Sequence, residues 1–388
     1  MHGRLLVAYS NTSNFVATTA EYLQSISRYS GFEVRYAHVT NDAELDFDLN
    51  EFDAIFQSYC ARLPRDNYVS ADYLDKLKSF AGIKPLAVQD EYDRTEKLRQ
   101  AIRDLQFDVV FTCVPDDGRE YVYPRAMFSE TEFISVLAGY VPAALEARWR
   151  SPTPLAQRTI TIGYRGRELP AYYGQLGFDK FEIGRRMREI CTANGIAHDI
   201  EMTEESRVYG NAWYGFLGNC RATLGTESGC NVFDFDGSLA ARFQALMMER
   251  NAAPSYEEFR IYTDPLEDKI SMGQISPRIF EAAALRTPLI LYSGRYSGLI
   301  APDEHYIELK KDFSNIDAVL ARINDLDGLE QMAARAYDRL IGSGELSYRR
   351  FAKFIGDTAR RKAEERGVKM RKPFGRFDAG EGFRRGGG

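Results

Sequence analysis

Ser276, Pro277 and Arg278 have the residue types of a helix start that can bind phosphate. Serine is a favoured N-cap, and proline is favoured at the first helical position. Backbone amides and the helix dipole attract anions to such an end, and Arg278 adds a positive charge. Glu281 follows about one turn later, where its carboxylate could accept hydrogen bonds from neighbouring hydroxyls of a diol. The residues beside Glu281 are apolar, so an exposed surface position is the less favoured interpretation.

Three basic residues, Arg165, Arg167 and Lys180, follow an apolar run at 159–162 that predicts a strand. The planar guanidinium fork of arginine suits phosphate oxygens. We expect these side chains to lie in the loop after the strand and to contact a bound phosphate group. Solvated surface charge is the alternative for one of the three.

Asp90 and Glu91 come directly after another predicted strand, at 85–88. Doubly wound sheets bind ligands beyond the carboxyl ends of their strands, and a carboxylate there could accept the proton of an attacking hydroxyl. Asp90 and Glu91 are therefore candidate catalytic bases. A competing interpretation is an acidic cluster at a helix N-terminus, where the helix dipole favours negative charge. That interpretation is the more favoured of the two.

Short apolar runs alternate with helical patterns over the first part of the chain. Strands are expected at 5–9, 34–39, 54–59, 85–88 and 109–114. Strands separated by helices predict parallel pairing in a doubly wound α/β sheet. The loop after the first run has no G-x-G-x-x-G pattern, so the fingerprint of nicotinamide- and flavin-binding proteins is absent.

A second α/β series begins after Pro152 and Pro154, which predict a linker between two domains. The length of 388 residues also fits two domains. We expect one domain at 1–150 and a second at 151–356, with an irregular, partly helical insertion at about 231–275. The remaining residues, 357–388, are rich in Lys and Arg and predict a disordered basic tail.

Residues 276–290, SPRIFEAAALRTPLI, resemble the glutamate helix of GT-B glycosyltransferases. Residues 163–170 and 177–180 are similar to the CgeB-like branch of these enzymes. The resemblance implies two Rossmann-like α/β domains facing a cleft, with the acceptor side in the N-terminal domain and the nucleotide-sugar site in the C-terminal one. It also implies metal-independent transfer of a hexosyl group from a nucleotide-diphosphate donor to an acceptor hydroxyl. The donor is a substrate, and no cofactor is expected.

The same resemblance implies roles for single residues. The second glutamate of the family motif, here Glu281, binds the ribose of the donor. Basic residues after the first strand of the second domain, here Arg165, Arg167 and Lys180, contact the diphosphate. Ser276 and Arg278 belong to the helix start on the same side of the site.

The sequence departs from the family pattern at two positions. Gly273 occupies the place of the first glutamate, eight residues before Glu281, and Thr287 replaces a usual glycine. Glu227, after a strand-like run, is a candidate replacement for the missing glutamate and would touch the donor sugar. Ser228 and Gly229 would then lie beside the donor, since glycine lets the backbone approach a ligand closely.

Two rival functions remain open. Asp234 and Asp236, in VFDFDGSL, resemble the first motif of haloacid-dehalogenase-type phosphohydrolases, in which the first aspartate is the nucleophile. The motif follows no long apolar strand, and no convincing partner lysine and aspartate pair follows it. The second rival is a non-catalytic nucleotide- or sugar-binding protein of the same fold, because fold alone does not settle activity.

Composition limits the class of protein. The net charge of -6 argues against a nucleic-acid-binding protein, and the five cysteines and four histidines are too scattered for a metal site. No apolar run is long enough to span a membrane, and no signal peptide is recognised, so a cytoplasmic protein with reduced thiols is expected. Expected partners are a nucleotide sugar and a glycan, protein or lipid-linked acceptor in polysaccharide biosynthesis. Weak contact of the basic tail with a membrane surface is a further expectation.

Overall fold

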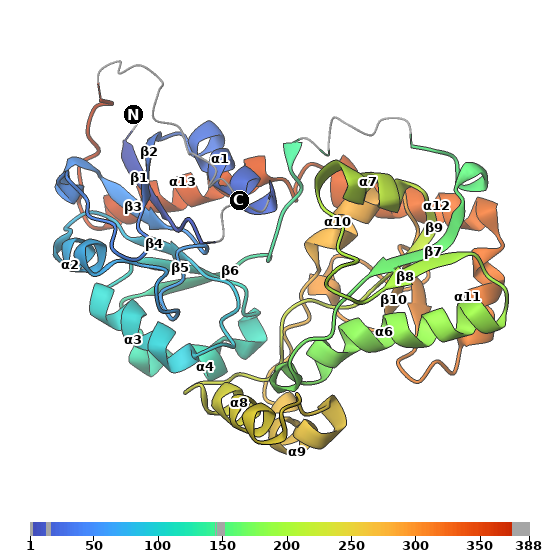
Figure 1. Cartoon of the computed structure of the whole chain (residues 1–388). Coiled ribbons are helices and arrows are strands. Elements are labelled where there is room, and N and C mark those ends of the chain that lie inside the picture. Colours follow the sequence, from blue (N-terminus) through green and yellow to red (C-terminus); the bar gives the residue numbers. More distant parts are fainter. Residues whose placement is uncertain (1–2, 13–16, 144, 146–151, 375–388) are drawn as a thin grey trace. The chain divides into compact units, whose positions relative to one another are not determined.

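The chain folds into two compact units, each built on one parallel sheet (Figure 1). The computed structural model describes residues 3–12, 17–143, 145 and 152–374. The first unit contains the described residues up to Val136, the segment Phe233–Gly237 and the residues from Tyr348 onward. The second unit contains Leu137–Val232 and Ser238–Ser347. This division differs from the expected one because the last helix and a short mid-chain segment pack with the first unit.

The first unit has a six-stranded sheet in the order β2-β1-β3-β4-β5-β6. Its strands are β1 Arg4–Tyr9, β2 Glu33–His38, β3 Ala54–Gln57, β4 Pro85–Ala87, β5 Val109–Thr112 and β6 Glu132–Ser135. Its helices are α1 Ala17–Tyr29, α2 Ala71–Ser79, α3 Thr95–Leu105, α4 Arg119–Val122 and α13 Tyr348–Glu365. All its strand pairs are parallel, and β3, β4 and β5 are fully buried. The order reverses between β1 and β3, so right-handed crossovers place α1 on one face and α2 with α3 on the other.

The second unit has a five-stranded parallel sheet in the order β11-β10-β9-β7-β8. Its strands are β7 Ile160–Arg165, β8 His198–Glu201, β9 Cys220–Gly225, β10 Leu289–Tyr292 and β11 Ile307–Leu309. Its helices are α6 Gly174–Ala193, α7 Gly210–Gly218, α8 Ser238–Arg250, α9 Tyr256–Glu267, α10 Pro277–Ala284, α11 Ile316–Ile323 and α12 Leu326–Tyr337. The prediction of doubly wound α/β sheets is confirmed in both units.

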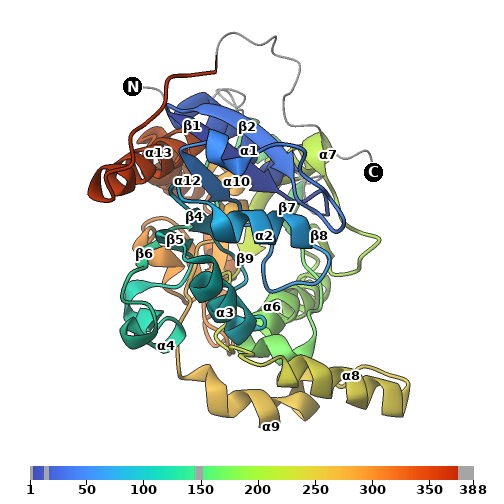
Figure 2. The same ribbon diagram turned by 90° about the vertical axis from the view of Figure 1, so that its left-hand side faces the viewer.

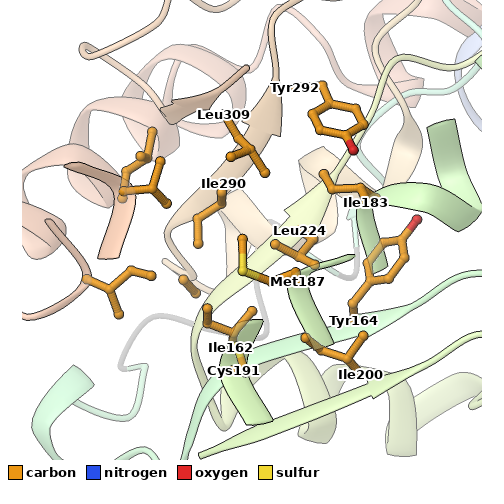
Figure 3. Close-up of a cluster of buried hydrophobic side chains, with 14 of the residues drawn as sticks. Ile162, Tyr164, Ile183, Met187, Cys191, Ile200, Leu224, Ile290, Tyr292 and Leu309 are labelled. Carbon is orange, nitrogen blue, oxygen red and sulfur yellow. The ribbon is translucent and has the colours of Figure 1, made fainter. Parts of the chain in front are cut away.

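Buried side chains cover both faces of the second sheet. On one face, Ile162, Leu224 and Ile290 of the strands pack against Ile183 and Met187 of α6 (Figure 3). On the other face, alternate residues of β10 pack against α10. Because successive strand side chains point to opposite faces, one short strand contributes to both cores. The two layers fix the start of α10 at the carboxyl edge of the sheet.

The insertion expected at about 231–275 contains two regular helices, α8 and α9, which lie side by side (Figure 2). Ser255 begins α9 with a capping box, since its hydroxyl accepts the Glu258 amide and the Glu258 carboxylate accepts the Ser255 amide. Phe243 of α8 and Phe259 of α9 are buried together against Ala171. The insertion is therefore a small helical layer with its own apolar core.

The prediction of a disordered tail at 357–388 is wrong over its described part. Helix α13 continues to Glu365, and Arg366 forms an ion pair with Asp108 at 2.8 Å. Further along, the Arg371 amide donates to Asp53 at 3.1 Å. Basic residues of this segment therefore pair with carboxylates of the first unit. Residues 375–388 lie outside the described residues.

Thr287 is part of a buried polar network. Arg158 is 2% exposed and donates to the Thr287 hydroxyl at 2.9 Å and to the Cys220 and Leu285 carbonyls at 2.9 and 3.0 Å. The Thr287 hydroxyl in turn donates to the Leu217 carbonyl at 2.9 Å. A buried guanidinium needs such acceptors, so the threonine here helps to satisfy Arg158.

We predict that Gly356→Ala destabilises the first unit. A Cβ atom at position 356 would lie 2.0 Å from the Ser30 carbonyl oxygen at the end of α1, and backbone cannot move aside cheaply. Overpacking of this kind lowers the free energy of unfolding by about 1–3 kcal/mol, even though alanine is the better helix former. Urea unfolding followed by circular dichroism measures the change. The control is Gly218→Ala, at a helical glycine with open space around it; equal stability of the two variants would contradict the packing argument.

Candidate functional site

The strand order of the second unit reverses between β7 and β9, and ligands of such sheets bind beyond the carboxyl ends of the strands at this point. Arg165 ends β7, and Arg167 lies in the exposed loop that follows. Glu227 comes directly after β9, and helix α10 begins at the same edge. The structure therefore brings three of the sequence-predicted segments to one edge of one sheet: the loop after β7, the residues after β9 and the start of α10.

The predicted helix start is confirmed. Ser276 is the N-cap of α10, its hydroxyl accepts the Arg278 amide at 3.4 Å, and Pro277 is the first helical residue. Pro277 has no amide hydrogen, and the Arg278 amide already donates to the Ser276 hydroxyl, so neither of these two positions offers a backbone donor to a ligand. Attraction for an anion rests on the helix dipole and on Arg278, which is exposed.

Glu281 is 9% exposed and lies on the first turns of α10. Its Oε2 accepts a hydrogen bond of 2.7 Å from the indole Nε1 of Trp213 on α7. The Arg278 guanidinium carbon lies 5.5 Å from the centroid of the same indole ring. Sequence reasoning missed Trp213, because it lies 68 residues before its partner and no local pattern joins them.

The Glu227 carboxylate lies beside Gly273, for which Glu227 was expected to substitute. Glu227 Oε1 accepts the amides of Arg295 and Tyr296 at 2.5 and 3.3 Å. A Cβ atom at Gly273 would lie 3.1 Å from the same oxygen. The carboxylate therefore occupies the space next to the missing side chain, although it comes from a different loop.

Ser228 and Gly229 contact other residues of the second unit. The Ser228 amide donates to the Gln274 carbonyl at 2.7 Å. Gly229 has φ +95°, and a Cβ atom there would lie 2.9 Å from Met272 Cβ. The glycine serves a left-handed turn that packs closely against Met272.

The side chain of Arg165 is engaged within the second unit. Its guanidinium forms an ion pair with Asp199 at 2.8 Å and donates to the carbonyls of Ser206 and Asp199 at 3.1 and 3.0 Å. Only 12% of the Arg165 side chain is exposed, and its charge is paired inside the unit, so these contacts do not support the predicted contact with a phosphate group. Lys180 lies half-buried on α6 instead of in the loop, and its carbonyl accepts the Tyr164 hydroxyl at 2.7 Å. Arg167 and Arg278 are exposed cations at this edge, and so is Arg295, which follows β10.

A pocket in the first unit lies beyond the carboxyl ends of β3 and β4. It is lined by Tyr59, Ala61, Arg62, Leu63, Pro64, Arg65, Leu86, Ala87, Val88, Gln89, Asp90, Asp93 and Leu98. Asp90 pairs with Arg62 at 2.7 Å and accepts the Tyr92 hydroxyl at 2.7 Å. Asp90 has φ +55°, a strained conformation for a residue with a side chain. Such strain is typical of functional sites, so Asp90 remains a candidate base.

No model of a known protein family matches the sequence, and no curated protein matches it. The structure of an alpha-glucosyltransferase in complex with UDP matches with a TM-score of 0.55 and 9% identity, over 92% of this chain and 100% of that one. A further alpha-glucosyltransferase structure, with UDP and a 13-mer DNA containing an HMU base, gives 0.54 and 12% over 93% and 100%. A sucrose-phosphate synthase from Thermosynechococcus elongatus gives 0.48 and 12% over 94% and 100%. The chain has the GT-B fold.

In this GT-B chain, Glu91 is not placed for proton transfer with a ligand. It is 1% exposed, and its carboxylate accepts the Tyr123 hydroxyl at 2.8 Å and the Cys113 amide at 3.0 Å, as well as the Thr112 hydroxyl. Burial raises the pKa of Glu91 to about 7, and the three donors oppose that shift. Glu91 ties the loop after β4 to β5, so the prediction that it is a catalytic base is not supported.

We predict that Glu91 makes the first unit less stable as pH rises. Because the folded pKa of Glu91 is about 7 and the ordinary pKa of a glutamate is about 4.5, the folded state keeps the proton between these two pH values while the unfolded state loses it, and the folded state loses stability as pH rises through this range. The loss amounts to roughly 3 kcal/mol at 1.36 kcal/mol per pKa unit. Glu91→Gln should remove this part of the pH dependence in urea unfolding between about pH 4.5 and 7.5. Glu130→Gln, at an exposed position, is the control, and equal slopes in the two variants would contradict the assignment.

Asp234 and Asp236 lie in the segment Phe233–Gly237 of the first unit. The Asp234 amide donates to the Tyr92 carbonyl at 2.8 Å, and the Phe235 carbonyl accepts the Glu96 amide at 2.8 Å. The segment pairs with the loop after β4. A phosphohydrolase nucleophile is expected directly after a sheet strand, and this segment follows none. Among the described residues no cluster of three or more metal-ligating side chains is found. No helix within the described residues is long and apolar enough to cross a membrane.

Proposed function

We propose that this protein is a glycosyltransferase that moves a sugar from a nucleotide-diphosphate donor to an acceptor hydroxyl. The observation that carries the proposal is the placement of Glu227 beside Gly273, next to the start of the helix that bears Glu281. In this arrangement a carboxylate lies beside Gly273, the position at which the motif of GT-B glycosyltransferases has its first glutamate. The UDP complexes of the alpha-glucosyltransferases with the same fold support a nucleotide donor.

The second unit would bind the donor. Arg278, at the N-terminus of α10, would contact the diphosphate with help from Arg167 on the exposed loop after β7. Glu281 would accept the ribose hydroxyls, and Glu227 would contact the donor sugar. Negative charge grows on the leaving diphosphate as the glycosidic bond breaks, so fixed cations stabilise the transition state more than the ground state. We propose that these cations suffice and that the transfer is metal-independent.

The first unit would bind the acceptor in the pocket beyond β3 and β4. Its charged side chains, Arg62 with Asp90 and Arg65 with Asp93, form ion pairs, and leucine, proline and valine complete the lining. A pocket of balanced charge and mixed polarity fits a neutral carbohydrate better than a polyanion such as DNA. Asp90 would take the proton of the attacking hydroxyl. Membership of the CgeB-like branch, a hexosyl donor and a role in polysaccharide biosynthesis in the cytoplasm complete this proposal.

Hydrolysis of nucleotide sugars, measured by release of the nucleoside diphosphate over a panel that begins with UDP-hexoses, tests the function. We expect slow hydrolysis of one donor without acceptor and faster turnover when a hexoside acceptor is added. Thermal shifts with the panel, beside phosphate monoesters with magnesium, separate the rivals. Stabilisation by a nucleotide sugar without turnover would indicate a binding protein, and magnesium-dependent phosphatase activity lost in Asp234→Asn would overturn the proposal.

A further inference from the structure

Trp213 contacts both of the side chains proposed to bind the nucleotide. Its indole N–H donates to Glu281 Oε2 at 2.7 Å, and its ring face lies 5.5 Å from the guanidinium carbon of Arg278. A hydrogen bond to a carboxylate is stronger than one between neutral groups, and a cation over an indole face is attracted by the ring quadrupole. One side chain therefore fixes the positions of a carboxylate and a cation three residues apart on α10.

Two further side chains, Phe216 and Arg165, pack in sequence behind the Trp213 indole. Phe216 stacks on Trp213 with ring centroids 5.6 Å apart and planes at 26°. The Arg165 guanidinium carbon lies 4.2 Å from the centroid of the Phe216 ring. The Arg278 guanidinium donates to the Arg165 carbonyl at 2.5 Å, which closes the stack into a ring of contacts. Arg165 thus contributes to the site through Phe216 and Trp213 and not by touching a phosphate.

Arg165, at the other end of this stack, is anchored in the sheet. Arg165 is the last residue of β7, and Asp199 of the adjacent strand β8 forms its ion pair. A site residue held by packing and by hydrogen bonds keeps its geometry better than one on a mobile loop. Glu281 is 9% exposed, and the hydrogen bond from the indole orients its carboxylate.

We propose that Trp213 is a positioning residue that sets the specificity of the site for ribonucleoside diphosphates. This inference rests on the proposed function. By fixing Glu281, Trp213 orients a carboxylate toward the 2′- and 3′-hydroxyls of a ribose. By stacking on Arg278, it places the cation for the diphosphate of the same ligand. A nucleotide without the 2′-hydroxyl loses one of its two hydroxyl contacts with Glu281 and retains the contact of its diphosphate with Arg278.

The test is isothermal calorimetry with UDP and 2′-deoxy-UDP, and with the corresponding pairs of ADP and GDP, on the whole chain. Wild type is expected to prefer the ribonucleotide of the tightest pair by about tenfold or more, the effect of one hydrogen bond to a charged group. Trp213→Phe retains an aromatic face for Arg278 and removes the indole N–H. We expect this variant to lose most of the preference while its affinity for the deoxynucleotide stays within about twofold.

Tyr209→Phe is the matched control, since Tyr209 is an aromatic residue 61% exposed just before the same helix. It should retain the wild-type preference, and both variants should unfold at the wild-type temperature. A lost preference in Trp213→Phe alone supports the proposal, because a role in packing would weaken both nucleotides equally. An unchanged ratio in Trp213→Phe would overturn it. Failure of wild type to bind any of the nucleotides would instead overturn the proposed function, and this inference with it.

Tryptophan emission provides a second, independent measurement. The chain has two tryptophans, Trp149 and Trp213, so Trp149→Phe leaves Trp213 as the single indole reporter. Nucleotide binding should change its emission with the same dissociation constant that calorimetry gives. Emission that stays constant while calorimetry records binding would contradict the placement of Trp213 beside the nucleotide.

Discussion

Asp90→Asn is expected to lower kcat of glycosyl transfer by about 10²–10⁴-fold, the usual contribution of a general base. The donor affinity should stay unchanged, because Asp90 lies in the pocket of the first unit and the donor is assigned to the second. Asparagine tolerates the left-handed backbone at φ +55° better than other replacements, so the strained turn should survive. Initial rates with saturating donor and acceptor, beside calorimetry with the nucleoside diphosphate, measure the two quantities.

The control for Asp90 is Asp93→Asn in the same pocket. Asp93 forms an ion pair with Arg65, so the replacement removes a carboxylate of the same kind at a similar place. We expect a change in kcat below about threefold, since that charge pair positions the wall of the pocket. If Asp93→Asn alone abolished turnover, the base would have to be reassigned to Asp93. If neither variant lost activity, the pocket would not contain the base.

The fold was predictable because most of the central strands are short apolar runs between helical patterns, although the more polar strands β6 (EFIS) and β8 (HDIE) were not predicted. The buried pattern of β5 and the serine–proline start of α10 are local features, and the structure has both where the sequence places them. By contrast, Phe233–Gly237 has no helical or strand pattern that names its partner. It packs with the first unit through Arg99, whose guanidinium lies 4.5 Å from the Phe235 ring. Such long-range contacts leave no periodic signal in the sequence.

The candidate site was predictable in position but not in detail. Parallel strands end at one edge of a sheet, so residues after β7 and β9 had to lie near each other. Which side chains face a ligand depends on their partners in three dimensions. Asp199 binds Arg165, and three donors enclose Glu91, although neither fact follows from the residue types alone. Trp213 was missed for the same reason, since its link to Glu281 exists only after α7 and α10 have packed.

Arg278→Ala is expected to weaken donor binding by about 10–150-fold, the effect of losing a hydrogen bond between charged groups. The loss in kcat should be larger still, because Arg278 meets more negative charge in the transition state than in the bound donor. Arg278→Lys retains the charge but lacks the planar fork and the stacking on Trp213, so it should recover only part of the activity. Steady-state kinetics and calorimetry on both variants separate the loss of charge from the loss of geometry.

Arg335→Ala on α12 is the matched control for Arg278. Arg335 is exposed and donates to the Glu304 carbonyl at 2.8 Å, so its removal deletes a surface cation of the same unit without touching the start of α10. Its donor affinity should match that of wild type, because isolated surface charges contribute little. Added salt should narrow the gap between wild type and Arg278→Ala, since screening weakens an exposed cation. If Arg278→Ala and Arg335→Ala bound the donor equally well, the start of α10 would not be the diphosphate site, and Arg167 on the loop after β7 would be the next cation to test.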